Sequence, residues 1–393
     1  MAKTIIPIGP YHPLQEEPEF FKLHVEGEKV VGLEIEIGYN HRGIEKLCES
    51  KTFDQVPFVV ERICGICSNS HPLACVQAIE DAGDIEVPER ALYIRTVVAE
   101  LERLHSHLLW LGLAGHFIGY NTVFMWAWKY REPVLDIFEK LTGNRNHYGM
   151  MKPGGVRRDL DHNDFSWILK ELDKLLASID MLKGAVMDDP VIHARLKGIG
   201  ILTKEQIINY SALGPTARAS GVAIDVRKDH PYAAYDRVKW KVITQEAGDV
   251  FAKAVVRILE MYESISIIRQ CLVNMPAGEI DSKPKEVHPG DGIGHAEAPR
   301  GEVFHFCRSD GSNRPVRYKV RAPSYMNITT NYIAAVGGTV SDAAIVLAAI
   351  DPCYCCTERM AVIDINTGKT VYNGQDLIRL SQEKTEKLRK TSR

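Results

Sequence analysis

Several features that define other classes of protein are absent from this sequence. No stretch of about 18 consecutive apolar residues occurs, so no segment is expected to cross a bilayer, and any membrane attachment should come through a partner. The opening residues, MAKTIIPIGPYHP, lack the apolar run behind a basic start that marks a signal peptide. A reducing compartment is therefore expected, in which paired cysteines bind metal more often than they form disulfides.

A strong charge of either sign is also lacking. The chain has 48 basic and 51 acidic residues, which gives a formal net charge of -3, and no long basic run occurs before the last few residues. This balance argues against a general nucleic-acid binder. What remains is the composition of an ordinary globular protein, with 45% hydrophobic residues and enough chain for a sizeable core.

The hydrophobic patterns predict a mainly α fold with small β regions, built around a bundle of long helices. The 393 residues divide into a β-rich N-terminal region (1–53), a helical bundle core (54–275), a loop and strand region whose final helix closes the site (276–359), and a C-terminal tail that can form a hairpin (360–393). Apolar alternation on both sides of an EGEK turn predicts a hairpin in the first region.

Apolar residues at intervals of three and four predict the long helices. The longest should contain Pro88 in its first turn and continue for many turns, and Pro153 with the two following glycines ends the pattern further along the chain. Helices are expected at residues 87–117, 131–143, 164–186, 244–272 and 331–350.

Two Cys-x-x-Cys pairs lie 286 residues apart. Cys64 and Cys67 form the first pair, and Cys353 and Cys356 form the second. Four thiolates suit zinc, an iron–sulfur cluster or another soft-ligated transition metal. A structural zinc site is the plain alternative, but such sites usually draw both pairs from within about 20 residues. Here the metal would lie at the centre of the fold.

The residues near these cysteines favour a chemical role. Arg62 precedes the first pair and His71 follows it, Asp351 precedes the second pair, and Arg300 lies in a Pro-Arg-Gly turn. A buried arginine beside metal-binding thiolates is a costly way to stabilise a fold. It suits a site that manages charge and protons.

The motifs together resemble one known family. RICGICSNSH, DPCYCCTER, HRGIEKL and EAPRGEVFH are similar to signatures of the nickel–iron hydrogenase large subunit. GPYHP, IGYNHRGIEKL, VPERALYIRTVVAELERLHSHLLWLG, MKPGGV and DVRKDHPYAAYD resemble the 49 kDa-type catalytic-arm subunit of respiratory complex I. A chain with both sets resembles the energy-converting, membrane-bound branch of these hydrogenases, and the resemblance runs from about residue 8 to residue 359.

The resemblance implies a set of metal ligands. Cys64 and Cys353 would bind nickel terminally, whereas Cys67 and Cys356 would bridge nickel and an iron that carries carbon monoxide and cyanide. Soft thiolate donors are compatible with this assignment. The spare cysteines are too few for an iron–sulfur chain, so no iron–sulfur cluster is expected in this polypeptide.

The resemblance also implies roles for charged residues. Arg300 would lie over the open face of the metal. The alternative role for Arg300 is a structural ion pair with Asp351. The two roles are compatible, because a catalytic arginine needs a partner that orients it. Glu17 matches the position of a proton-relay glutamate near a terminal thiolate. Glu16 is expected to be the solvated neighbour, although the two glutamates could exchange roles. His71 should either hydrogen-bond near the cysteines or be a satisfied core histidine.

A second metal is implied with a weaker match. Glu45 aligns with a carboxylate that binds a magnesium-like ion in many relatives, but the usual histidine three residues after the last cysteine is Arg359 here. Because a cation cannot replace a ligand, Glu45 would alternatively pair with an arginine. The five other cysteines are interpreted as small buried apolar residues, namely Cys48, Cys75, Cys271, Cys307 and Cys355.

The resemblance predicts a catalytic subunit that interconverts protons, electrons and hydrogen. Its expected partners are a small hydrogenase subunit with a [4Fe-4S] cluster, a further iron–sulfur subunit, antiporter-like membrane subunits that move ions, and ferredoxin. The subunit should lie peripherally on the cytoplasmic side of the cell membrane. The alternatives are a complex I-like quinone or sulfur reductase subunit and a non-catalytic scaffold stabilised by zinc.

Overall fold

The computed structural model describes residues 3–284, 286–358 and 362–391 of the chain. Helices dominate this structure, and its strands form small antiparallel sheets. None of the described helices is long and apolar enough to cross a membrane. The predicted fold class, mainly α with small β regions around long helices, is confirmed.

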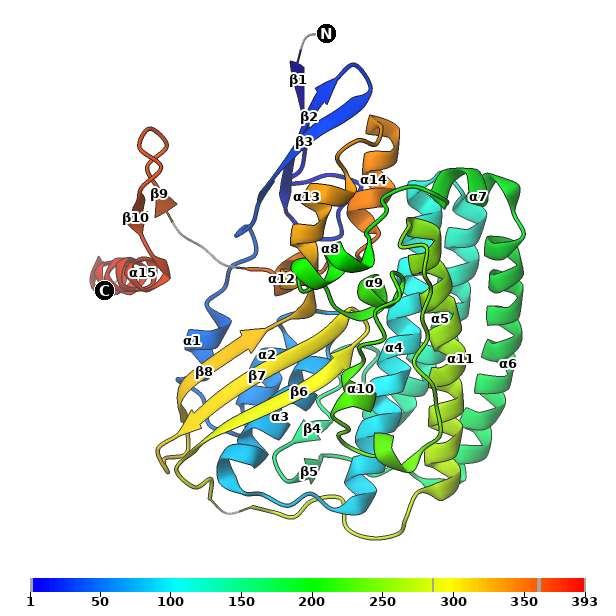
Figure 1. Cartoon of the computed structure of the whole chain (residues 1–393). Helices are drawn as coiled ribbons and strands as arrows, with labels where there is room; N and C mark the ends of the chain where they lie inside the picture. Colours follow the sequence, from blue (N-terminus) through cyan, green and yellow to red (C-terminus); the bar gives the residue numbers. More distant parts are fainter. Residues whose placement is uncertain (1–2, 285, 359–361, 392–393) are drawn as a thin grey trace.

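Four long helices lie side by side and form the bundle (Figure 1). They are α4 (Glu89–Phe117), α5 (Asn121–Thr142), α6 (His162–Met187) and α11 (Val250–Asn274). All four were predicted, and Pro88 directly precedes α4, where its missing N–H costs no helical hydrogen bond. The bundle supplies the rigid wall against which the rest of the chain packs.

Helix α5 begins ten residues before its predicted start at residue 131. Its first half packs closely on two glycines of α4. A Cβ atom on Gly112 would lie 3.2 Å from the Cβ of Ala127, and one on Gly115 would lie 3.1 Å from the Cβ of Val123. This contact between helices stabilises the aromatic-rich segment as a helix, and sequence periodicity does not reveal it.

A three-stranded sheet covers the other side of the molecule. Its antiparallel strands are β6 (Gly290–Ala298), β7 (Gly301–Ser309) and β8 (Pro315–Arg321), in that order. The sheet lies across α3 (Ser70–Gly83), the helix that follows the first cysteine pair (Figure 1). The tight β6–β7 turn presents Arg300 toward the bundle.

Glycines allow β6 to lie directly on α3. A Cβ on Gly292 would lie 2.1 Å from the carbonyl oxygen of Ala78, and one on Gly294 would lie 2.0 Å from that of Ala74. Neither glycine could carry a side chain without separating the two elements. This close contact sets the distance between the first cysteine pair and Arg300.

The N-terminal sheet lies at one end of the bundle, near α13 (Asn331–Ala334) and α14 (Val340–Ala348) (Figure 1). It contains β1 (Lys3–Ile8), β2 (Phe20–Glu26) and β3 (Lys29–Glu36). The predicted hairpin at EGEK is confirmed, and Gly27 has the positive φ of 65° that the turn requires. The segment between β1 and β2 carries Glu17.

The single helix predicted at residues 331–350 is wrong. The structure contains α13 (Asn331–Ala334) and α14 (Val340–Ala348), separated by a turn in which Gly337 has a φ of 92°. The backbone N–H of Gly337 donates to the carbonyl of Val30 at 2.9 Å. At Gly337 and Gly338 the backbone therefore hydrogen-bonds to β3 and does not continue the helix.

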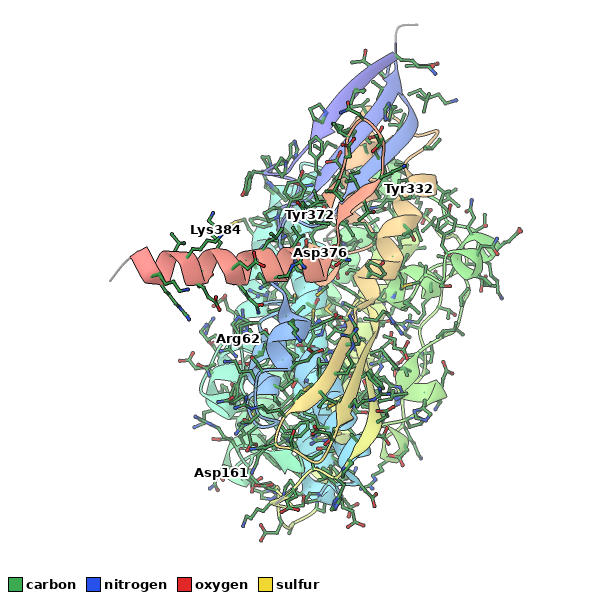
Figure 2. All side chains as sticks on the ribbon, turned by 90° about the vertical axis from the view of Figure 1, so that its left-hand side faces the viewer. Arg62, Asp161, Tyr332, Tyr372, Asp376 and Lys384 are labelled. Atoms are coloured by element: carbon green, nitrogen blue, oxygen red, sulfur yellow. The ribbon has the colours of Figure 1, made fainter. Side chains whose placement is uncertain are left out.

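The tail contains the predicted hairpin, formed by β9 (Val362–Ile363) and β10 (Thr370–Tyr372). It also contains a helix that was not predicted, α15 (Gly374–Thr391). Asn373 and Asp376 exchange two hydrogen bonds at its start, which satisfies backbone N–H groups of the first turn. Figure 2 shows α15 extending beyond the edge of the body, with Lys384 on its outer part.

Short elements connect these units. They are α1 (Ile44–Cys48), α2 (Val56–Glu61), β4 (Met151–Lys152), β5 (Gly155–Val156), α7 (Pro190–Leu196), α8 (Lys204–Asn209), α9 (Gly214–Arg218), α10 (Val226–Asp229), η1 (Tyr235–Arg237), α12 (Pro323–Asn327), η2 (Ile328–Thr330) and η3 (Tyr354–Cys356).

Candidate metal centre

The four cysteines of the two Cys-x-x-Cys pairs meet at one buried point. Their sulfur atoms all lie within 4.8 Å of one another. The Sγ of Cys353 is 3.1 Å from that of Cys64 and 3.0 Å from that of Cys356. The four residues are only 2 to 7% exposed. The fold thus assembles a four-thiol site from opposite ends of the chain.

Local structure points each pair inward. The first pair lies in the turn between α2 and α3, where the N–H groups of Ile66 and Cys67 donate to the Sγ of Cys64 at 3.3 and 3.4 Å. The second pair surrounds η3, and the N–H of Cys353 donates to the hydroxyl of Ser324 at 3.1 Å. These contacts orient the sulfurs before any metal binds.

The thiols influence one another strongly. The pKa of Cys64 is lowered, first because the Cys353 thiol donates to its sulfur and then because Cys356 and Cys67 do so. The pKa of Cys353 is raised by the same kind of contact, which favours its protonated form. One thiolate is therefore stabilised by its neighbours, whereas four adjacent thiolates need a bound cation.

Arg300 and Asp351 form a buried pair beside the cysteines, and each is 1% exposed. The guanidinium of Arg300 donates to the backbone carbonyl of Asp351 at 2.7 Å and to its carboxylate at 2.6 Å. Burial acts to lower the pKa of Arg300, but Asp351 and the cysteine sulfurs outweigh it, so the pKa is raised well above its usual value. Arg300 is thus a permanent cation held at the site.

Asp351 adopts an uncommon backbone conformation, with a φ of 56°. Aspartate tolerates this left-handed region better than most residues. The turn ends the α14 segment and places Cys353 two residues later at the site. Its second carboxylate oxygen is buried, and no described group donates to it. An orphaned acceptor at this position is typical of a pocket shaped for an additional group.

Glu17 contacts the second cysteine pair. One carboxylate oxygen lies 3.9 Å from the Sγ of Cys353, and the other accepts the N–H of Cys355 at 2.6 Å. Burial raises the pKa of Glu17, and the Cys64 thiolate raises it further. Glu16 keeps accessible surface, as predicted, yet the surrounding chain desolvates its carboxyl group and raises its pKa to about 8.

His71 hydrogen-bonds at the cysteine cluster, which is one of the two roles predicted for it. Its Nε2 lies 3.5 Å from the Sγ of Cys356, and its Nδ1 lies 3.1 Å from the Nε2 of His305. The sequence interpretation missed His305, and likewise Tyr318 and Ser324. Alternation along β7 places His305 on the apolar face with Val303 and Cys307. That signal could have identified it.

The residues around Glu45 do not fit a magnesium ion. Its carboxylate pairs with Lys319 and accepts the N–H of Val320 at 3.0 Å. The alternative prediction was an ion pair between Glu45 and an arginine, but the partner in the structure is Lys319. Within the described ranges, the four cysteines form the only group of three or more potential ligands that could hold a metal. Arg359 lies outside the described residues.

The remaining cysteines divide by burial. Cys48, Cys75, Cys271 and Cys307 are fully buried, as expected for small apolar residues. Cys355 is only partly buried and supports Glu17 through its backbone.

An open cavity of about 550 Å³ connects the cysteine cluster to the surface. Cys355 and Cys356 lie in its lining, whose charged side chains carry both signs: Arg42, Lys46, Arg317 and Lys319 together with Glu45, Glu49 and Glu358. Glu45 pairs with Lys319, and Glu49 pairs with Lys46 and Arg317. Arg42 is anchored by donating to the backbone carbonyls of Arg62 and Ile63. Asn373 of the tail also borders this cavity. The metal centre thus approaches the surface at one mouth lined by charges of both signs.

The donor set fits a nickel–iron centre. Four converging sulfurs offer the soft ligands that such metals prefer, and the permanent cation Arg300 offsets part of their negative charge. A structural zinc site would also use four thiolates, but it would not require a buried arginine, a glutamate with a raised pKa and an open cavity in the same place.

Two family descriptions match the chain. Residues 118–292 and 282–359 match the family described as "Respiratory-chain NADH dehydrogenase, 49 Kd subunit". Residues 42–113, which contain the first cysteine pair, match the family described as "Nickel-dependent hydrogenase".

Individual proteins resemble the chain over nearly its full length. The membrane-bound hydrogenase subunit alpha of Pyrococcus furiosus is 40% identical over 98% of this chain and 93% of the relative. The carbon monoxide-induced hydrogenase of Rhodospirillum rubrum is 39% identical over 91% of this chain and 100% of the relative. A solved chain of the membrane-bound sulfane sulfur reductase, an archaeal respiratory membrane complex, superposes with a TM-score of 0.87 at 30% identity, covering 91% of this chain and 98% of that chain.

Proposed function

We propose the reaction of this chain from the premise that it belongs to the nickel–iron hydrogenase large-subunit family, in the energy-converting membrane-bound branch related to the 49 kDa subunit of complex I. It is the catalytic, oxidoreductase subunit of a membrane-bound hydrogenase-like complex and is peripheral to the membrane. The proposal is that it reduces protons to hydrogen, or catalyses the reverse reaction.

The convergence of the four sulfurs beside a fully buried arginine carries this proposal. Cys64 and Cys353 would hold nickel, and Cys67 and Cys356 would bridge nickel to an iron with carbon monoxide and cyanide ligands. Such a centre supplies the electrons and the open coordination position at which hydrogen is formed or split. The chain's own residues would bind the centre, hold charge beside it and move protons.

Glu17 is the proposed proton relay. A carboxylate 3.9 Å from a cysteine sulfur needs little movement to exchange a proton with it. Burial and the nearby thiolate raise its pKa, which brings the carboxyl group closer to the range where it can both accept and release protons. Glu16, with a pKa of about 8, is the next candidate on the way to the surface.

Arg300 is proposed to stabilise negative charge at the reacting atoms. The two hydrogen bonds from its guanidinium to Asp351 hold it rigidly, so no reorganisation is needed during turnover. Asp351 would act as a positioning residue through Arg300. In a water-poor pocket, a fixed cation of this kind interacts more strongly than it would in water.

Electrons are proposed to arrive on the side of this open cavity. The cavity reaches Cys356, so a partner subunit with a [4Fe-4S] cluster that docks over it would bring the cluster close to the metal centre. The family resemblance extends this proposal to a further iron–sulfur subunit, antiporter-like membrane subunits and ferredoxin as the electron donor. The cytoplasmic side of the membrane is the proposed location.

Sulfur reduction is the second candidate. It is supported by the similarity to the solved chain from a sulfane sulfur reductase complex. The complete four-cysteine site is compatible with hydrogenase chemistry, which makes hydrogen the preferred substrate here.

One set of measurements on the purified complex separates these functions. Nickel with a larger amount of iron, because the partner clusters also hold iron, infrared bands of diatomic ligands on iron, and hydrogen evolution with reduced ferredoxin are the expected results. Zinc alone would support a scaffold. Reduction of polysulfide without hydrogen evolution would support the sulfur reductase and overturn the proposal.

A further inference from the structure

We propose that His71, His305 and Tyr318 form an ordered chain of hydrogen-bond donors that ends on the sulfur of Cys356 and withdraws electron density from it. His305 and Tyr318 are positioning residues in this proposal because they act only through His71. The inference deepens the proposed function, and it depends on that function only in requiring a bound metal that keeps Cys356 a thiolate.

The geometry of the chain is continuous. The Nε2 of His71 lies 3.5 Å from the sulfur of Cys356, within the longer range of hydrogen bonds to sulfur. The Nδ1 of His71 lies 3.1 Å from the Nε2 of His305, and the Nδ1 of His305 lies 2.6 Å from the hydroxyl of Tyr318. Tyr318 also contacts the thiol of Cys75.

The chain is sealed from solvent. His71, His305, Tyr318 and Cys75 are each 0 to 1% exposed. The described hydrogen-bond partners of the two rings are the sulfur of Cys356, each other and the phenol of Tyr318. A second proton on either ring would be a buried charge with no carboxylate beside it, so both imidazoles are neutral. In a neutral imidazole one nitrogen donates and the other accepts. If one nitrogen accepts a hydrogen bond, the other must donate one, so all hydrogen bonds along the chain run in the same direction.

A thiolate at Cys356 determines that direction. A metal-bound thiolate can only accept, so the Nε2 of His71 must carry its proton and the Nδ1 must accept from His305. The Nδ1 of His305 then accepts from the hydroxyl of Tyr318, which commits the single proton of that hydroxyl to the histidine. Each donated hydrogen bond polarises the next, so Tyr318 strengthens the bond at the sulfur without touching it.

The same geometry argues against a proton exit along this route. The chain ends at Cys75, which packs with the buried residues Cys48 and Cys307. No described member of it reaches the surface. A closed chain of donors can shift electron density at a metal ligand, as outer hydrogen-bond partners generally do at metal sites.

The first test needs no catalytic activity. The full chain is labelled with ¹⁵N-histidine and loaded with Zn²⁺, a diamagnetic ion that keeps the four cysteines as thiolates. Nuclear magnetic resonance should show both His71 and His305 protonated on Nε2 and unprotonated on Nδ1. A proton on the Nδ1 of either histidine would overturn the proposal. Because hydrogen turnover is not measured, failure of the proposed function cannot produce this result.

The second test measures the loaded complex by infrared spectroscopy. Tyr318→Phe removes one oxygen and keeps the ring, and His305→Leu breaks the chain beside His71. Both should shift the carbon monoxide band to lower wavenumber, His305→Leu by more, because the sulfur regains electron density. Tyr235→Phe is the matched control, since that buried hydroxyl donates to Glu100 instead. An unchanged band in Tyr318→Phe with normal metal content would contradict the proposal.

Discussion

Glu17 is the residue whose loss should slow turnover most while leaving the metal site intact. Glu17→Gln keeps the shape of the side chain and its hydrogen bond from Cys355 but removes the proton-exchanging group. We expect hydrogen evolution to fall by about 100-fold or more, the typical contribution of a positioned acid–base group. Nickel and iron content should stay at the wild-type level.

Glu16→Gln is the matched comparison for Glu17. Glu16 lies one residue away and retains accessible surface. Its replacement should reduce turnover far less. The opposite order, with Glu17→Gln fully active and Glu16→Gln inactive, would exchange the two roles that the sequence interpretation assigned.

Arg300 combines a structural and a chemical contribution, and two substitutions separate them. Arg300→Ala leaves the buried Asp351 carboxylate without its cation and should cost about 3–5 kcal/mol of folding free energy. Arg300→Lys retains a positive charge but cannot reproduce the two hydrogen bonds to Asp351. We expect it to fold and bind metal, with turnover reduced by roughly 100-fold. Wild-type turnover in Arg300→Lys would show that the guanidinium geometry is unimportant.

At the level of elements, the contact between β6 and α3 is the one that holds the site's two halves together. In Gly292→Ala, the new methyl group would meet the backbone oxygen of Ala78, which cannot move without shifting α3. We expect a loss of about 1–3 kcal/mol in the free energy of unfolding, the usual cost of overpacking. Urea denaturation measures it, and metal content should fall as the cysteines separate from Arg300.

Gly184→Ala is the control for this substitution. Gly184 lies inside α6, and the nearest atom to its added Cβ is a flexible carboxylate oxygen of Asp188 at 3.7 Å. Alanine should stabilise the helix by up to about 1 kcal/mol. If both alanine variants unfold alike, close packing of β6 on α3 is not what makes Gly292 necessary.

For the whole molecule, a buried ionic network between α4 and α11 makes stability depend on pH. Arg218 pairs with Glu260 at 2.8 Å and with Glu297 at 2.7 Å, and His107 approaches Glu260 at 2.8 Å. All four side chains are nearly or fully buried. Burial lowers the pKa of His107 to about 4, although Glu260 acts to raise it. The folded chain therefore holds His107 neutral where the unfolded chain would protonate it.

The sign of the effect follows from this difference. Between pH 6.5 and pH 4 the unfolded state binds the extra proton, so stability falls as the pH is lowered through that range. The shift corresponds to roughly 3 kcal/mol from His107 alone. In urea titrations at several pH values, His107→Gln should lose this part of the pH dependence. His116→Gln, at the exposed end of the same helix, should retain it; equal slopes in both variants would contradict the assignment.

Prediction from the sequence succeeded where the determinants are local or carried by motifs. The period of α4, the EGEK turn and the fold class were visible in the order of residues. The four cysteines were recognised as one site because their motifs resemble a known family, and the structure brings their sulfurs together. The roles assigned to Glu17, Arg300 and Asp351 remain predictions, now with a defined geometry.

The sequence by itself determined most of each long helix of the bundle and which four cysteines are the candidate metal ligands, since periodicity and motif spacing are properties of neighbouring residues. Only the tertiary structure decided that residues 331–350 break at Gly337, that Glu45 pairs with Lys319, and that His71 is joined to His305. Each of these outcomes depends on a group that is distant in the chain. Such contacts form only after the chain has folded, so no local pattern contains them.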